Sequence, residues 1–256
     1  MASDAANVLF LSLFLGHIVG DFFLQPDRWV KDKVDNKIKS KYLVIHALLH
    51  GLISGLIFSV FLWNGSSSLI IDVLFVFGYV SLSHWCIDVM KTYMNRSYIW
   101  FLVDQILHVW ILAILTYGMV YHRELDNLLE RAKSIDLSIV LPILIVYLLM
   151  LKPTAVLVGE VLNKWTQQVN GRANKGLEDA GKYIGYIERV LILTFVLTSQ
   201  YAAIGFVLAA KSIFRMGDLR DEHDRQFTEY VMVGTLFSVS VSLFSGLFIV
   251  HVLGLQ

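Results

Sequence analysis

Histidine and aspartate residues form four pairs in the first half of the 256-residue chain, and the members of each pair stand four residues apart. The pairs are His17 and Asp21, His46 and His50, His84 and Asp88, and Asp104 and His108. Four residues advance an α-helix by about one turn, so both side chains of a pair project from one face, about 6 Å apart. Because imidazole and carboxylate groups are common ligands of Zn, Mn and Fe, this pattern predicts a metal site.

The pairs lie in a chain that is apolar enough to cross a membrane several times. It is 56% hydrophobic and 16% charged, with a mean hydropathy of +0.63, whereas about a quarter of an average soluble domain is charged. This composition excludes a soluble enzyme, a disordered protein and a disulfide scaffold, and the single cysteine, Cys86, cannot form an internal disulfide. The zero net charge gives no reason to expect a nucleic-acid partner. We therefore predict an all-α membrane protein.

Stretches of about 20 apolar residues predict a bundle of about seven transmembrane helices in a single integral membrane domain, residues 1–256. The predicted spans are 6–25, 42–63, 69–92, 98–120, 137–159, 183–210 and 228–255. The four spans within 1–120 carry the His and Asp pairs, and the three within 137–256 are expected to support them. The first apolar stretch has no basic n-region and no A-x-A pattern, so we expect it to remain as a helix.

The four pairs fall at matching depths in these spans. The first and third pairs lie near the ends of 6–25 and 69–92, and the second and fourth lie near the starts of 42–63 and 98–120. In an up-and-down bundle these ends meet on one side of the membrane. Ionisable groups inside a membrane are costly and point to function by default. We therefore expect all eight side chains to meet in one metal site.

A structural interpretation of single pairs stands beside this one. A lone membrane histidine is commonly a hydrogen-bonded core residue, and one pair at this spacing can simply stabilise its helix. Eight donors exceed one coordination shell that keeps a reactive position. They predict two divalent ions, Zn or Mn with Fe as an alternative, about 3.5–4 Å apart. In a further alternative, some of the eight orient imidazoles from outside the shell.

Other polar residues share this depth. Asp21, Asp88 and Asp104 are candidates for a general base. Lys91 follows His84 by seven residues, so it shares that helical face and either holds an anionic substrate group or snorkels to the interface. Gln25, Asn95 and Gln105 are expected to form hydrogen bonds between helices.

Two other patterns concern packing and the membrane surface. Small residues recur at four-residue spacing, as in Gly16 and Gly20 or Gly51 and Gly55, and predict close helix packing. The basic segment 27–41 has Trp29, Val34 and Ile38 as its apolar members and is predicted to lie on anionic headgroups of the lipid bilayer. It could also attract a phosphorylated substrate.

Basic residues in the predicted loops set an orientation. Twelve lie on one side: Arg28, Lys31, Lys33, Lys37, Lys39, Lys41, Lys91, Arg96, Lys164, Arg172, Lys175 and Lys182. Seven lie on the other: Arg123, Arg131, Lys133, Lys211, Arg215, Arg220 and Arg225. The first side is predicted to be cytoplasmic, with the N-terminus outside and the C-terminus inside. Glu188 and Arg189 are expected to pair with each other or with Glu160.

Four sequence runs carry a family resemblance: HIVGDFFLQPD (17–27), HALLHG (46–51), HWCIDVMK (84–91) and DQILHVW (104–110). They resemble a bacterial membrane family known as domain of unknown function 3307. The runs at 185–193, 203–215 and 229–239 are similar to its longer members. The resemblance implies a protein of the bacterial inner (plasma) membrane and brings no established activity.

The favoured function is a metal-dependent hydrolase at the cytoplasmic interface, acting on a phosphoester or lipid headgroup. A transition-metal transporter or channel is the first alternative, since intramembrane His and Asp also mark ion pathways. A di-iron oxidase of lipid chains and a metal-stabilised scaffold are two more. The expected partners are the lipid bilayer and an anionic or phosphorylated substrate, and a homo-oligomer is left open.

Overall fold

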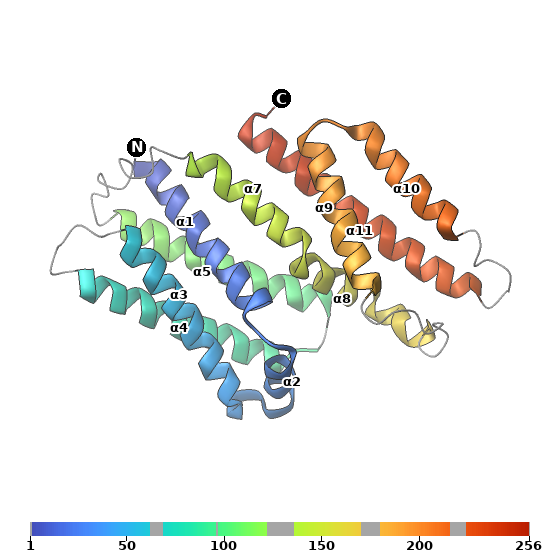
Figure 1. The fold of residues 1–256 in the computed structure, drawn as a ribbon. Helices are drawn as coiled ribbons and strands as arrows, with labels where there is room; N and C mark the ends of the chain where they lie inside the picture. Colours follow the sequence, from blue (N-terminus) through green and yellow to red (C-terminus); the bar gives the residue numbers. More distant parts are fainter. Residues whose placement is uncertain are drawn as a thin grey trace. The chain divides into compact units, whose positions relative to one another are not determined.

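The computed structural model of the chain describes residues 2–61, 69–95, 97–121, 136–169, 180–215 and 224–255. In these ranges all regular secondary structure is helical, which confirms the predicted all-α class (Figure 1). Several of the helices are long and apolar enough to cross a membrane, so the chain is a multi-pass membrane protein. It divides into two compact units, Met1–Ile145 and Val146–Gln256, each of which is described by itself.

Four long helices form the first unit. Their bounds are α1 Ala2–Ile18, which continues as the π-helix η1 Val19–Phe23, then α3 Lys41–Phe61, α4 Leu69–Thr92 and α5 Tyr98–Tyr121. Helix α3 packs along α4, α1 contacts both α3 and α5, and α4 contacts α5. These contacts close a four-helix bundle with a common interior.

The bundle interior changes character along its length. On the side of the α1 N-terminus it is a hydrophobic core, made of Leu9, Leu13, Phe58, Val76, Val80, Leu112 and Leu115. In lipid, such contacts stabilise by dispersion rather than by removal from water. The buried polar side chains of the His and Asp pairs fill the interior toward the other end. The apolar core therefore supports the polar cluster from one side.

Small residues let the helices of this bundle approach closely, as predicted. A Cβ atom built on Gly51 of α3 would lie 2.6 Å from the backbone oxygen of Phe77 on α4, and one on Gly16 of α1 would lie 2.8 Å from Ile53 of α3. Any larger residue would force the helices apart.

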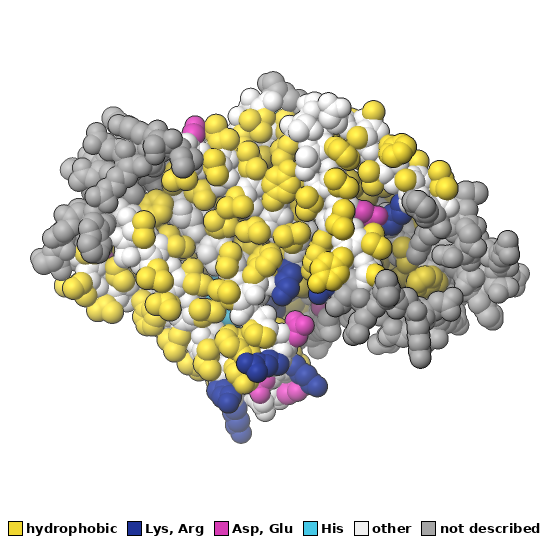
Figure 2. Space-filling view, in the orientation of Figure 1, with side chains coloured by type: hydrophobic (Ala, Val, Ile, Leu, Met, Phe, Trp, Pro, Cys, Tyr) yellow, Lys and Arg dark blue, Asp and Glu magenta, His cyan; other side chains and the backbone are white. Residues whose placement is uncertain are grey.

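A short amphipathic helix, α2 Asp27–Asn36, follows η1 and leads through the 3₁₀ turn η2 Lys37–Lys39 into α3. Its apolar side chains Val30 and Val34 point outward, with Val34 61% exposed, while Trp29 stacks on Tyr42 at 5.4 Å. Figure 2 shows hydrophobic side chains over most of the visible face, with Lys and Arg gathered at the end that carries α2. This is the pattern of a helix at a lipid–water boundary.

The second unit consists of the end of α7 Leu137–Met150, then α8 Lys152–Val169, α9 Ala180–Leu197, α10 Tyr201–Arg215 and α11 Asp224–Leu253. Helix α11 packs against α8 and α9, and α10 packs against α9. The core that these helices share is apolar and consists of Ile192, Val196, Ile204 and Val250.

The predicted span 137–159 is not one straight helix. Helices α7 and α8 meet at a 41° bend around Leu151. Pro153 causes the break, because it has no N–H for the carbonyl of Leu149 one turn earlier. The hydroxyl of Thr154 donates to that carbonyl instead, at 2.6 Å.

The side chain of Arg189, on α9, stabilises the bend between α7 and α8. Its Nε donates to the carbonyl of Met150 at 2.5 Å, and its Nη1 donates to the Ser238 hydroxyl at 3.1 Å. Glu188, one of the two expected partners of Arg189, forms an ion pair with Lys211. A buried guanidinium at the end of α7 also complements the negative end of the helix dipole.

The predicted span 183–210 is also wrong as a single helix. The chain breaks at 198–200, where Ser199 has a φ of +58°, and α10 then runs back along α9. Lys211 returns to Glu188 (Nζ to Oε2, 2.5 Å), although the two were predicted on opposite sides. In the described residues there are thus five candidate spans, or six if the bent pair α7 and α8 counts as one, in place of the predicted seven.

Candidate metal centre

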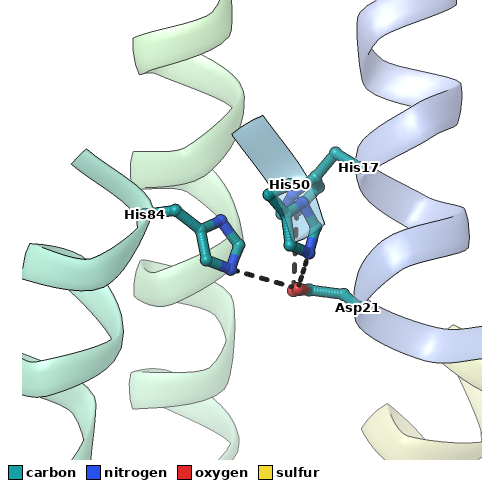
Figure 3. A group of neighbouring side chains, drawn as sticks. All are labelled: His17, Asp21, His50 and His84. Carbon is teal, nitrogen blue, oxygen red and sulfur yellow. Dashed lines mark ion pairs between the residues drawn. The ribbon is translucent and has the colours of Figure 1, made fainter. Parts of the chain in front are cut away.

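Asp21 is the centre of the polar cluster in the four-helix bundle. Its Oδ1 lies 3.0 Å from Nε2 of His50, 3.1 Å from Nε2 of His46 and 3.5 Å from Nε2 of His84. Its Oδ2 lies 3.7 Å from Nε2 of His17. Figure 3 shows the carboxylate with the rings of His17, His50 and His84 turned toward it. One carboxylate thus faces imidazoles from three helices.

A π-helical turn positions this carboxylate. Helix α1 ends at Ile18, and the backbone N–H of Leu24 donates to the carbonyl of Val19 at 2.9 Å, five residues back. Such turns are rare and occur often at functional sites. The side chain of Asp21 still meets that of His17, four residues earlier, as their spacing predicts.

The five imidazoles of the cluster are in mutual contact and are almost fully buried. None is more than 4% exposed. The rings of His50 and His84 stack with centroids 3.8 Å apart, and those of His84 and His108 lie 4.1 Å apart. His17 lies 4.9 Å from His108. Side chains from all four helices therefore share one small volume.

Several of these ring nitrogens lack a well-formed hydrogen bond. Within the described part of the chain, Nε2 of His17, His50, His84 and His108 is buried and makes no hydrogen bond of normal geometry, although the first three lie 3.0–3.7 Å from the Asp21 carboxylate. Nδ1 of His108 lies 2.8 Å from the backbone carbonyl of Asp104, which places its proton on Nδ1 and leaves a lone pair on Nε2. Buried polar atoms are costly when unsatisfied. A cation among these nitrogens would satisfy them.

The structure brings all eight predicted metal ligands together, in three overlapping groups whose ligand atoms lie within 4.8 Å of one another. The groups are His17, Asp21, His50 and His84; then His46, His84 and Asp88; then Asp21, Asp104 and His108. The first group has the most donors and shares a member with each of the other two.

Two lysines hold the other two carboxylates. Nζ of Lys33 lies 2.5 Å from Oδ2 of Asp88, and Nζ of Lys91 lies 2.5 Å from Oδ2 of Asp104. Asp104 is buried, with 2% of its side chain exposed, whereas 41% of the Lys91 side chain is exposed. Lys91 is thus bound to the cluster and also reaches its surface.

Lys33 is predicted from the sequence only as one of the basic loop residues, with no role in the site. A usable signal is present, because Lys33 follows Trp29 by one helical turn. The Trp29 ring stacks on Tyr42 of α3, so the face that these two residues share turns toward the bundle. Lys33 is accordingly buried.

Gln105 connects two of the carboxylates, as predicted for an interhelical hydrogen bonder. Its Nε2 donates to Oδ2 of Asp21 at 3.1 Å and to Oδ2 of Asp104 at 3.0 Å. Asn95 is exposed instead, and Nε2 of Gln25 is buried without a partner in the described residues.

The charges of the cluster favour a cation. Three carboxylates face two ammonium groups, which leaves one negative charge when the imidazoles are neutral. A divalent ion would make the whole cluster positive by one charge, a state suited to an anionic ligand. Neutral imidazole and carboxylate donors fit Zn, Mn or Fe.

No curated protein and no solved structure matches this chain. A family model matches residues 9–139, which include all eight clustered residues together with Lys33 and Lys91. The later runs at 185–193, 203–215 and 229–239 lie beyond the matched residues. Since the match covers half of the chain, the chain belongs to the DUF3307 family, which is described as a protein of unknown function.

Proposed function

We propose that this membrane protein is a metal-dependent hydrolase of phosphoesters, with its centre in the four-helix bundle. One observation carries the proposal: the buried rings of His17, His50, His84 and His108, whose Nε2 atoms make no well-formed hydrogen bond in the described residues, pack together beside the Asp21 carboxylate. Mixed imidazole and carboxylate ligation is typical of hydrolytic metals.

The first group is the best place for the ion, with His17, His50 and His84 as nitrogen donors and Asp21 as the oxygen donor. When bound there, Zn or Mn, or alternatively Fe, would supply Lewis acidity and activate water near neutral pH. Gln105 keeps the Asp21 carboxylate oriented through its hydrogen bond.

Asp104 is the best candidate for the general base. Its Oδ2 is held by Lys91 and Gln105, whereas its Oδ1 is buried without a hydrogen-bond partner in the described residues. In hydrolysis, a water oxygen would bond to phosphorus while the ester bond breaks. The water proton would pass to Oδ1 of Asp104 and then to the leaving oxygen. Lys91, which reaches the surface, would bind the anionic phosphoryl oxygens.

The transporter alternative is less well supported. Transport requires a polar path through the other half of the bundle, and the interior there is filled by the apolar core around Leu13, Phe58 and Val80. A di-iron oxidase is also less favoured, because Lys33 and Lys91 already engage two of its three carboxylates.

The proposed orientation places the cluster at the cytoplasmic side of a bacterial inner membrane, with the N-terminus outside. The exposed apolar face of α2 and its basic neighbours suit anionic headgroups at that surface. Because α10 runs back along α9, the basic residues after 210 would join the cytoplasmic side. We therefore propose a C-terminus on the outside, which separates the positive charges more strongly than the prediction from seven spans does.

The test is metal analysis and turnover on the purified, full-length protein in detergent. Bis-p-nitrophenyl phosphate and p-nitrophenyl phosphate serve as diester and monoester probes. We expect bound metal, turnover that stops after chelation, and turnover that returns with Zn²⁺ or Mn²⁺. His50→Ala should lose both metal and turnover, and His251→Ala, an exposed histidine on α11, is the matched control. Turnover in metal-free protein would refute the mechanism. Metal uptake into liposomes that requires His84 would favour transport.

A further inference from the structure

Two of the three ligand groups already contain a cation from the protein itself. The group with Asp88 includes the Lys33 ammonium at 2.5 Å, and the group with Asp104 includes the Lys91 ammonium at 2.5 Å. In each case the lysine contacts one oxygen of the only carboxylate that the group does not share with the first group. The first group, around Asp21, has no lysine within ion-pair distance in the described residues.

A metal ion and an ammonium group compete directly for one carboxylate. Like charges a few ångströms apart repel strongly in a membrane interior, where the effective dielectric constant is low. The Lys33–Asp88 pair is almost fully buried, with 9% and 8% of the two side chains exposed, so water does not screen it. A second ion at Asp88 would therefore have to displace Lys33.

We propose that the centre binds a single divalent ion at His17, Asp21, His50 and His84. The ammonium groups of Lys33 and Lys91 supply the positive charge that a second and a third ion would otherwise bring to Asp88 and Asp104. The inference rests on the metal centre of the proposed function and changes its stoichiometry from the predicted two ions to one. Each lysine favours the ionised form of the carboxylate beside it, and with one divalent ion and neutral imidazoles the cluster would carry one positive charge. The lysines fill the role that the second metal has in two-metal hydrolases, which is to stabilise negative charge on the transferred group.

Each lysine is held in place because it joins two separate helices. Lys33 comes from α2, outside the bundle, and its burial ties that helix to α4 through Asp88. Lys91 lies in the last turn of α4 and reaches Asp104 on α5. Both cations therefore also join separate elements of the bundle, which gives each a defined place.

Zinc stoichiometry of the full-length protein tests the inference. After stripping and reloading with Zn²⁺, the natural protein should hold about one ion per chain. Lys33→Met and Lys91→Met should each hold about two, because the freed carboxylate and its histidines become available. Lys31→Met, an exposed lysine on the same helix, should stay at about one. Adding Asp88→Asn to Lys33→Met should return the count to about one.

A second measurement needs no variant. The electron paramagnetic resonance spectrum of the Mn²⁺-loaded natural protein should be that of an isolated ion, whereas two ions in adjacent groups would give a spin-coupled pair. A coupled spectrum, or about two Zn²⁺ per chain with both lysines present, overturns this inference and leaves the proposed hydrolase standing. A count that stays at about one in folded Lys33→Met also overturns it. A natural protein that binds no Zn²⁺ or Mn²⁺ at all refutes the proposed function itself.

Discussion

Gly20 on η1 packs directly against the imidazole of His50 on α3, and a Cβ atom on Gly20 would lie 2.6 Å from Nε2 of that ring. The absence of a side chain at this position is what lets the ring reach Asp21. Elsewhere in a helix, replacing glycine by alanine stabilises by roughly 0.5–1 kcal/mol. Here the steric contact opposes that gain.

We expect Gly20→Ala to displace His50 and to weaken Zn²⁺ binding about 10- to 100-fold, as other changes that misorient a ligand do. Isothermal titration or competition with a chelating dye measures the affinity. Gly78→Ala is the control, because a Cβ atom there meets nothing within 4 Å. Equal zinc affinity in Gly20→Ala and the natural protein would show that His50 is not a ligand.

Asp104→Asn should separate catalysis from metal binding. As the general base, Asp104 is expected to contribute about 10²–10⁴-fold to turnover of the phosphoester probes. Replacing Asp104 should leave the zinc content unchanged, because the proposed ligands are His17, Asp21, His50 and His84. Asp35→Asn, on the exposed face of α2, is the control. If zinc is lost together with turnover, Asp104 is a ligand instead.

Arg189→Met should destabilise the second unit. The guanidinium donates to the carbonyl of Met150 and to Ser238, and the bend caused by Pro153 leaves few other donors for these groups. Each buried polar group left unsatisfied costs about 1–3 kcal/mol, so we expect a loss of about 2–5 kcal/mol in the free energy of unfolding. Arg189→Lys should lose less.

Denaturant titration in detergent measures this change. Lys182→Met, an exposed substitution on the same helix, should shift the unfolding midpoint little. An equal midpoint for Arg189→Met and Lys182→Met would mean that the bend does not depend on the arginine.

The reversal at Ser199 predicts the side of the membrane for the segments around it. In a Cys86→Ser background, single cysteines at Lys39 and Ser212 should react with an impermeant maleimide from the cytoplasmic side, and one at Ser199 from the outside. Labelling of the Ser212→Cys variant from the outside would instead support one continuous span over 183–210.

The meeting of the four His and Asp pairs could be predicted from the sequence because it depends on helical periodicity and on hydropathy. Helical periodicity fixes which side chains share a face, and hydropathy fixes their depth. Thus His46 and His50, or Asp104 and His108, could be placed together without coordinates. The same reasoning could not find the π-helical turn at Asp21, since one extra residue per turn leaves no mark on hydropathy.

The errors in the second unit have a common cause. Hydropathy averages over about 20 residues, so a break of three residues at 198–200 disappears inside a long apolar window. Lys211 and Glu188 then fall on opposite sides in the prediction, although they pair in the structure.

Lys33 was missed for a different reason. A charged residue in a basic amphipathic segment is expected to be exposed to solvent unless its helical neighbour Trp29 is considered.

The apolar core around Leu9, Leu13 and Phe58 closes the bundle beyond the imidazoles. Protons and ions would then reach Asp21 from a single compartment. The centre would respond to the free-metal level and acidity of that compartment, and the bilayer would keep its electrochemical gradients whatever reaction takes place at the cluster.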